Sequence, residues 1–122
     1  VEPAADLLPA LDRRVAVAQL GGDDELFVEI ATLFIDDAPT VLASLRAALA
    51  AGDAKVVHRT AHTLKGSAGC VGGEPAAKAA AAVEALGHSG NLADAPAAVE
   101  VLATELDRLL TALAADLSPA AG

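Results

Sequence analysis

Apolar residues recur at three- and four-residue intervals along most of the chain, the spacing that places them on one face of an amphipathic helix. In the first half, this pattern begins after Asp23-Asp24 and continues to Leu49. The clearest run lies near the end of the chain and contains Val99, Leu102, Leu106, Leu109, Leu110, Leu113 and Leu117. The pattern therefore predicts a series of helices whose apolar faces meet in a common core.

Glycine and aspartate residues mark the expected boundaries of the first helices. Asp12 is suited to cap a short helix that ends just before Gly21-Gly22, because its side-chain oxygen can accept a hydrogen bond from the first turn. A longer helix follows, and Gly52-Asp53 ends it and caps the next one. Pro39 lies inside the longer helix, so we expect a kink or a short break near residues 37–38.

Three further helices are expected. The third covers residues 54–71, and the fourth covers residues 75–86 with a proline at its first position. Residues 88–91, which include His88, are expected to form a loop. The last helix begins either at Leu92 or at Pro96.

Composition narrows the fold class. The chain holds 32 Ala and 18 Leu, but only 11 Val, 2 Ile and 2 Phe. Alanine and leucine favour helices, whereas β-branched and aromatic residues favour strands. We therefore predict an all-α fold, an antiparallel four-helix bundle with a short additional N-terminal helix. At 122 residues the chain is expected to be one domain, with its core at residues 11–117 and flanking segments at 1–10 and 118–122.

Charge and cysteine content exclude several functions. The net charge of −9 is the opposite of what a binder of phosphate backbones needs, so nucleic acid is not an expected partner. The single cysteine, Cys70, cannot form an intramolecular disulfide, and we expect it to be partly buried. An unpaired cysteine suits a reducing compartment, so we expect a cytoplasmic chain. Neither a membrane-spanning run nor a signal peptide is visible, so we expect no direct membrane contact. Because it begins at Val1 and contains no Met, we expect a domain excised from a longer protein.

One stretch departs from the acidic balance. Residues 54–73 hold no Asp or Glu, but they hold three of the eight basic residues and two of the three histidines. On a helical wheel of about 100° per residue, one face gathers the following residues within roughly 60° of His62: Lys55, His58, Arg59, Lys65, Gly66 and Gly69. The opposite face, predicted to be in the core, holds Val57, Ala61, Leu64, Ala68 and Val71.

The residues on the polar face of this helix suit a nucleophile that receives an anionic group. Imidazole is substantially neutral near pH 7 and can attack phosphorus, which makes His62 a candidate nucleophile. Lys65, one turn further, would offset the charge of a phosphoryl group. Gly66 and Gly69 each cost about 1 kcal/mol of helix stability relative to alanine, and we interpret them as steric clearance beside the imidazole. Spacing alone also fits an inert surface histidine.

A specific motif lies in this helix. The segment Ala61-His62-Thr63-Leu64-Lys65-Gly66-Ser67, with Gly72 ten positions after the histidine, resembles the signature of histidine-containing phosphotransfer (HPt) domains of two-component phosphorelays. The resemblance extends from Leu11 to Leu117. It includes the segment Phe34-Ile35-Asp36-Asp37-Ala38-Pro39, which looks like the family's preceding helix junction.

The resemblance implies a role for each matching residue. His62 is the implied phosphoacceptor through its Nε2 atom, Lys65 would contact the phosphoryl group, and Gly66 would give it clearance. Glu84, 22 residues after His62, lies where the family often has Gln or Glu oriented toward the imidazole. A carboxylate there would accept the Nδ1 proton and fix the tautomer. His88 stands where Arg or Lys is common, so a second phosphate-facing cation is not expected.

The resemblance predicts a phosphorelay intermediate, a module of a hybrid sensor histidine kinase. It would accept a phosphoryl group from a receiver-domain phospho-aspartate on His62 and pass it to another receiver-domain aspartate. The receiver would supply Mg²⁺, so we expect no cofactor of the chain's own. No phosphate loop or nucleotide-binding kinase motif is present, so the chain is not expected to use ATP itself. The resemblance implies a phosphocarrier rather than an enzyme. We expect a monomer that binds receiver domains transiently.

Two other functions stay open. Lys55, His58 and Arg59 form a docking face beside His62, and a helical adaptor would bind a protein there without phosphotransfer. His58 and His62, four residues apart, also fit a metal-binding bundle. No cysteine or acidic residue accompanies them on that face, so a metal is not expected.

Overall fold

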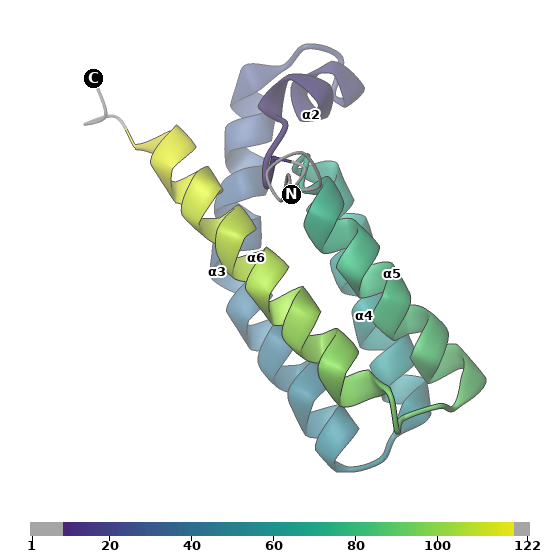
Figure 1. Ribbon diagram of the computed structural model, residues 1–122. Coiled ribbons are helices and arrows are strands. Elements are labelled where there is room, and N and C mark those ends of the chain that lie inside the picture. Colours follow the sequence, from purple (N-terminus) through teal and green to yellow (C-terminus); the bar gives the residue numbers. More distant parts are fainter. Residues whose placement is uncertain (1–8, 119–122) are drawn as a thin grey trace, which may run out of the picture.

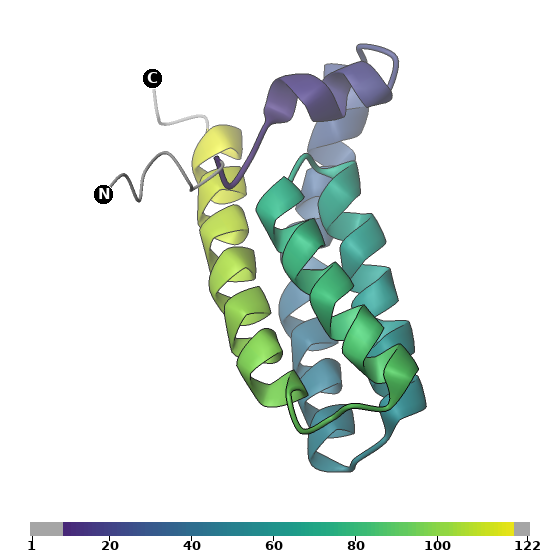
Figure 2. The same ribbon diagram turned by 45° about the vertical axis from the view of Figure 1, so that its right-hand side comes forward.

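The computed structural model describes residues 9–118, which form five helices and no strand. The helices are α2 (Arg13–Gln19), α3 (Asp24–Ala50), α4 (Ala54–Cys70), α5 (Glu74–Ser89) and α6 (Ala95–Leu117). The four long helices run antiparallel in a bundle, and α2 lies across one end of it (Figures 1 and 2). The predicted fold class is thus confirmed.

Aspartate side chains cap the starts of α2, α3 and α4. Asp12, Asp23 and Asp53 each accept a hydrogen bond from the backbone N–H three residues later, at 3.2, 2.9 and 3.2 Å. Each of these bonds satisfies a donor that has no partner within its helix. The cap at Asp53 sets where α4 begins.

Helix α3 is continuous through Pro39 over 27 residues, so the expected break near residues 37–38 is absent. Pro39 removes one backbone N–H, but it is exposed to solvent. On either side of it, Phe34, Ala38 and Leu45 are buried in the same core. Packing against one core therefore holds both halves of α3 in a single helix.

Helix α5 ends at Ser89, three residues later than predicted, so His88 belongs to its last turn and not to a loop. Gly90 ends the helix in the left-handed conformation, with φ of 79°, which an amino acid with a side chain rarely adopts. Helix α6 starts at Ala95, with Pro96 in its first turn. Of the two expected starts, Pro96 is therefore closer to the observed one than Leu92. The extension of α5 brings His88 beside α4.

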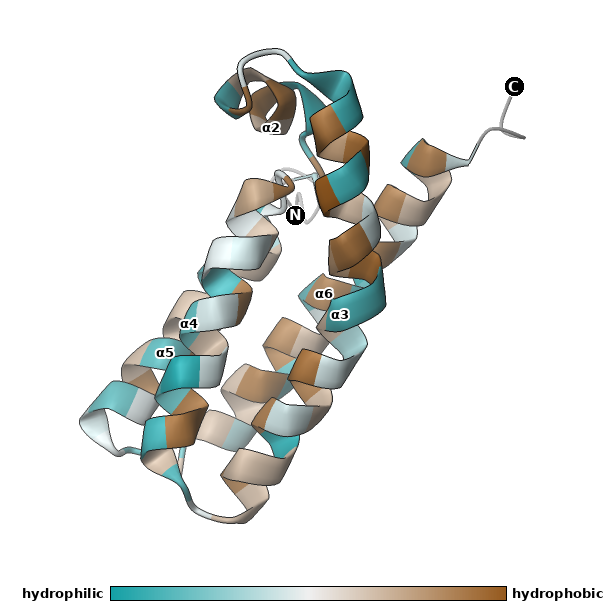
Figure 3. Ribbon diagram, turned by 180° about the vertical axis from the view of Figure 1, so that it is seen from behind, coloured by the Kyte–Doolittle hydropathy of each residue, from teal (hydrophilic) through white to brown (hydrophobic). Residues whose placement is uncertain are grey.

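The core lies between the inner faces of the four long helices. All five residues of the predicted apolar face of α4 are buried, namely Val57, Ala61, Leu64, Ala68 and Val71. Figure 3 shows hydrophobic residues recurring along α3 and α6, while α4 and α5 carry hydrophilic residues on their outer side. None of the helices within residues 9–118 is long and apolar enough to cross a membrane.

Helix α2 is fastened to the bundle by charge and backbone contacts. Arg13 forms ion pairs with Asp116 of α6 and Asp24 of α3. Its guanidinium carbon also lies 4.8 Å from the centroid of the Phe27 ring, within the range of a cation–π contact. The backbone N–H of Asp12 donates a hydrogen bond to the backbone carbonyl of Gly72, at 2.8 Å. These contacts tie α2 to α3, α6 and the end of α4.

Helices α4 and α5 approach closely at Gly87. A Cβ atom at this buried position would lie 2.6 Å from the backbone nitrogen of His58 and 2.9 Å from its Cα. Backbone atoms cannot move aside cheaply, so a side chain here would push the two helices apart. Gly87 therefore keeps α5 close enough to α4 for its side chains to reach the polar face of α4.

We predict that Gly87→Ala destabilises the fold by about 1–3 kcal/mol, the usual cost of overpacking a core. Gly66→Ala is the matched control, because an added Cβ there meets no atom within 4 Å. The control should gain up to about 1 kcal/mol from helix propensity. Urea denaturation of both variants measures the difference. A Gly87→Ala variant as stable as Gly66→Ala would show that the helices do not depend on this close approach.

Candidate functional site

The outer face of α4 presents an imidazole and an ammonium group to solvent. The side chain of His62 is 64% exposed and that of Lys65 is 40% exposed. A Cβ atom at Gly66 or at Gly69 would have no neighbour within 4 Å, so open space surrounds both positions. The predicted orientation of α4 leads to this arrangement, because its opposite face is buried in the core.

Glu84 of α5 brings the two polar side chains together. One carboxylate oxygen, Oε2, lies 2.7 Å from Nδ1 of His62, and the other, Oε1, lies 2.8 Å from Nζ of Lys65. The carboxylate itself is largely covered, with 16% of the side chain exposed. A single carboxylate from the neighbouring helix thus holds the histidine and the lysine at once.

This geometry selects a tautomer of the His62 ring. The Glu84 carboxylate only accepts hydrogen bonds, so Nδ1 of His62 must carry the proton that it donates. In the neutral ring the lone pair then lies on Nε2, the nitrogen that is not engaged with Glu84. The site therefore combines a free imidazole nitrogen, a nearby cation and open space, which suits an imidazole that takes up an anionic group.

The charge on Glu84 is favoured by both of its partners. Its carboxyl pKa is lowered, chiefly by the hydrogen bond from Lys65 and next by the hydrogen bond from His62. Partial removal from water acts in the opposite direction and is the smaller effect. Glu84 consequently remains ionised at neutral pH, as its two hydrogen bonds require.

The three residues of the expected docking face lie apart from this carboxylate, toward the start of α4. Lys55 and Arg59 are exposed, whereas His58 is half-buried against α5. The Nδ1 atom of His58 lies 3.3 Å from the backbone oxygen of Glu84, and its ring centroid is 6.4 Å from that of His62. His58 is therefore turned toward α5 and does not share the open surroundings of His62.

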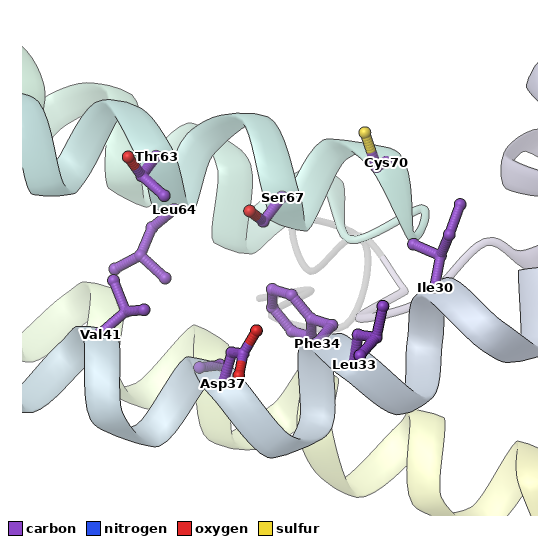
Figure 4. Close-up of a pocket in the computed structure, with 10 residues that line it drawn as sticks. Ile30, Leu33, Phe34, Asp37, Val41, Thr63, Leu64, Ser67 and Cys70 are labelled. Carbon is purple, nitrogen blue, oxygen red and sulfur yellow. The ribbon is translucent and has the colours of Figure 1, made fainter.

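A groove on the other flank of α4 was not foreseen from the sequence. It lies between α3 and α4, has a volume of about 210 Å³, and is lined mostly by apolar side chains. Figure 4 shows Phe34, Asp37 and Val41 of α3 facing Leu64 and Ser67 of α4 across it. The lining residues are Ile30, Leu33, Phe34, Asp37, Ala38, Val41, Thr63, Leu64, Ser67 and Cys70.

Two features of the groove differ from sequence expectations. Cys70 is exposed, and not partly buried as expected, because it lies in the last turn of α4 on the flank of the core stripe. Leu33 is 62% exposed, although its spacing matched the apolar pattern of α3. An apolar residue on the edge of a helical stripe is compatible with either the core or a surface groove, which is why periodicity did not reveal this one.

Residues 9–118 contain no group of three or more His, Cys, Asp or Glu side chains that could hold a metal ion. The His58–His62 pair, which the metal-binding alternative invoked, has nearly parallel rings with an interplanar angle of 16°. One nitrogen of each ring is engaged with Glu84, through its carboxylate for His62 and its backbone oxygen for His58. The arrangement offers this pair no further side-chain ligand.

Comparisons with known proteins identify similar sequences and folds. The family model of the Hpt domain matches residues 29–115. Among solved structures, the fold is similar to the crystal structure of histidine-containing phosphotransfer protein B (HptB) from Pseudomonas aeruginosa PAO1. The TM-score is 0.81 and the sequences are 29% identical, with 90% of this chain and 96% of the other chain covered. No curated protein sequence matches the chain.

We predict that the pKa of Glu84 depends more on Lys65 than on His62. Lys65→Ala should raise this pKa toward the ordinary value for glutamate, and His62→Gln should raise it less. Carbon-13 NMR titration of the glutamate carboxyl groups measures each pKa. Because the pKa of Glu84 is lower in the folded chain than in the unfolded chain, ionised Glu84 stabilises the fold at pH values above its unfolded-state pKa. This stabilisation is lost as the pH falls through its folded-state pKa. An unchanged Glu84 titration in Lys65→Ala would contradict the ion pair.

Proposed function

Because the chain belongs to the family of Hpt domains, we propose that His62 is its phosphoacceptor and that the chain is a phosphorelay intermediate. Membership establishes a phosphotransfer role in two-component signalling, and Hpt domains are phosphocarriers rather than enzymes. The proposal goes further in three respects. It names His62 as the acceptor, a receiver-domain phospho-aspartate as the donor, and an aspartate of another receiver domain as the destination.

One observation carries this proposal, namely the 2.7 Å contact between Nδ1 of His62 and the Glu84 carboxylate. The contact fixes the proton on Nδ1 and leaves Nε2 as the free base of a ring that is 64% exposed. A nucleophile must present its lone pair to the incoming group, and Nε2 does so without first losing a proton. His58 lacks these surroundings, because its ring is half-buried.

The transfer step balances without a proton leaving the site. The Nε2 lone pair of His62 forms a bond to phosphorus, while the bond from phosphorus to the aspartyl oxygen breaks and releases a carboxylate. The ring then carries a positive charge, and Glu84 offsets this charge through the hydrogen bond that it already accepts from Nδ1. Transfer to the next aspartate reverses these bond changes.

Lys65 and the glycines would accommodate the phosphoryl group. In the unphosphorylated chain Nζ of Lys65 lies 2.8 Å from Glu84. At 40% exposure its flexible side chain can turn from that carboxylate to a phosphoryl oxygen on Nε2 of the neighbouring ring. Gly66 supports this arrangement, because no side chain occupies the space one turn beyond His62. Gly69, nearly two turns away, leaves the same face open to the partner.

The proposed partners are receiver domains, which Hpt proteins bind transiently. The receiver would bring the aspartate and its Mg²⁺, so the chain itself would contribute the imidazole and a binding surface. Lys55 and Arg59 lie toward the start of α4 from His62, and the apolar groove that includes Thr63 lies between α3 and α4. We propose that a receiver domain covers both the basic residues and the groove when it reaches His62.

We also propose that the chain acts as a monomer in a cytoplasmic relay, such as that of a hybrid sensor histidine kinase.

We predict that His62→Gln abolishes phosphoryl acceptance while the fold is kept, because His62 is exposed and contributes little packing. The measurement is incubation with a phosphorylated receiver domain, followed by assay for acid-labile, alkali-stable phosphate on the chain. His58→Gln is the matched control and should retain acceptance within a few fold. Phosphate incorporation by His62→Gln at the wild-type level would refute the assignment. Absence of transfer to wild type from any receiver would favour an adaptor that binds without phosphotransfer.

A further inference from the structure

The three histidines of the chain lie in a row along the contact between α4 and α5. The ring of His58 lies between the other two, with its centroid 6.4 Å from that of His62 and 5.4 Å from that of His88. His88 reaches this position because α5 continues to Ser89 and packs closely on α4 at Gly87. The proposed phosphotransfer uses His62 alone, so the juxtaposition of His58 and His88 has no part in it.

Hydrogen bonding leaves one nitrogen of His58 free as a base. Its Nδ1 atom lies 3.3 Å from the backbone oxygen of Glu84, and since a carbonyl only accepts, Nδ1 carries the proton. The lone pair of the neutral ring is then on Nε2. A histidine that binds a metal through one nitrogen commonly donates its other N–H to a backbone carbonyl, which orients the ring. His58 has this supporting bond already.

The separation of the rings distinguishes the two histidine pairs. Zinc binds imidazole nitrogen at about 2.0–2.1 Å, which puts the ring centroid about 3.2 Å from the metal, so two rings at the tetrahedral angle have centroids about 5 Å apart. The His58–His88 separation of 5.4 Å, with ring planes tilted by 45°, is close to this value. The 6.4 Å between His58 and His62 would instead require nearly linear coordination.

The surroundings of the pair limit what it can bind. A shallow concavity contains both rings and is also lined by Lys55, Ser89 and Gly90. No third His, Cys, Asp or Glu completes a cluster within residues 9–118, so water would fill the remaining coordination positions. The ammonium group of Lys55 opposes a cation here, although its side chain is exposed and can turn outward.

We propose that His58 and His88 form a two-imidazole site for a transition-metal ion of the zinc class, open to water and separate from the phosphotransfer chemistry. Imidazole nitrogen suits zinc, copper and nickel, and does not suit Mg²⁺, which prefers oxygen ligands. The ion would link the start of α4 to the end of α5. It would also add positive charge to the docking face formed by Lys55, His58 and Arg59, one helical turn from His62.

The test is titration of the full chain, carrying no histidine tag, with Zn²⁺ at neutral pH. Calorimetry should give one saturable site, and the melting temperature should rise with Zn²⁺ because the ion binds the folded chain. Long-range proton–nitrogen NMR should show shifts of the ring nitrogens of His58 and His88. His88→Gln should lose saturable binding, and it is expected to fold because His88 is exposed. His58→Gln should lose binding as well.

His62→Gln is the control and should bind Zn²⁺ as wild type does. Lys55→Gln should bind it more tightly, because the substitution removes the opposing charge. No saturable binding by wild type would overturn the proposal. It would also be overturned if His62→Gln lost binding while His88→Gln kept it, since the ion would then lie between His58 and His62.

Discussion

The carboxylate of Glu84 connects the chemistry of α4 to the packing of α5. Its two oxygens lie 2.7 Å from Nδ1 of His62 and 2.8 Å from Nζ of Lys65. One largely covered carboxylate thus contacts both exposed groups of the site. These distances depend on how closely the two helices approach. Gly87 permits that approach, since a Cβ atom there would meet the backbone of His58. A packing constraint one turn from Glu84 therefore underlies the geometry of the imidazole.

The charges of the site are arranged for a change of partner. In the unphosphorylated chain Lys65 and the hydrogen bond from His62 both favour ionised Glu84, which lowers its pKa. In the proposed mechanism, a phosphoryl group on Nε2 would bring negative charge to one side of the ring while the ring itself becomes positive. Lys65 would then bind the phosphoryl oxygens, and Glu84 would offset the positive charge of the ring. The same three side chains suit both states with a small movement of one flexible lysine.

The helices and the polar face of α4 could be predicted from local rules. Asp12 and Asp53 cap helices where the sequence indicated, and the apolar stripe from Val57 to Val71 is buried as the wheel predicted. Pro39 shows where a local rule fails. It removes one hydrogen bond, but buried residues on both sides hold α3 together through tertiary contacts that a local rule cannot include.

Features that depend on two helices were harder to obtain from the sequence. Glu84 was indicated by resemblance to a family position, whereas its distance from His62 depends on the approach of α5 to α4. The groove beside Thr63 and the pairing of His58 with His88 were both missed. Helical periodicity assigns a residue to a face, but it does not say which face of another helix lies opposite. Because residues 88–91 were expected to form a loop, the position of His88 in the last turn of α5 was not predicted.

The central claim is that Glu84 holds the His62 imidazole with its proton on Nδ1 and its lone pair on Nε2. Long-range proton–nitrogen NMR of the chain, at a pH where the ring is neutral, measures this tautomer directly. The account predicts that Nε2 of His62 is unprotonated and Nδ1 protonated in the wild type, and that this preference weakens in Glu84→Ala. A wild-type ring with its proton on Nε2, or a tautomer unchanged by the loss of Glu84, would contradict it.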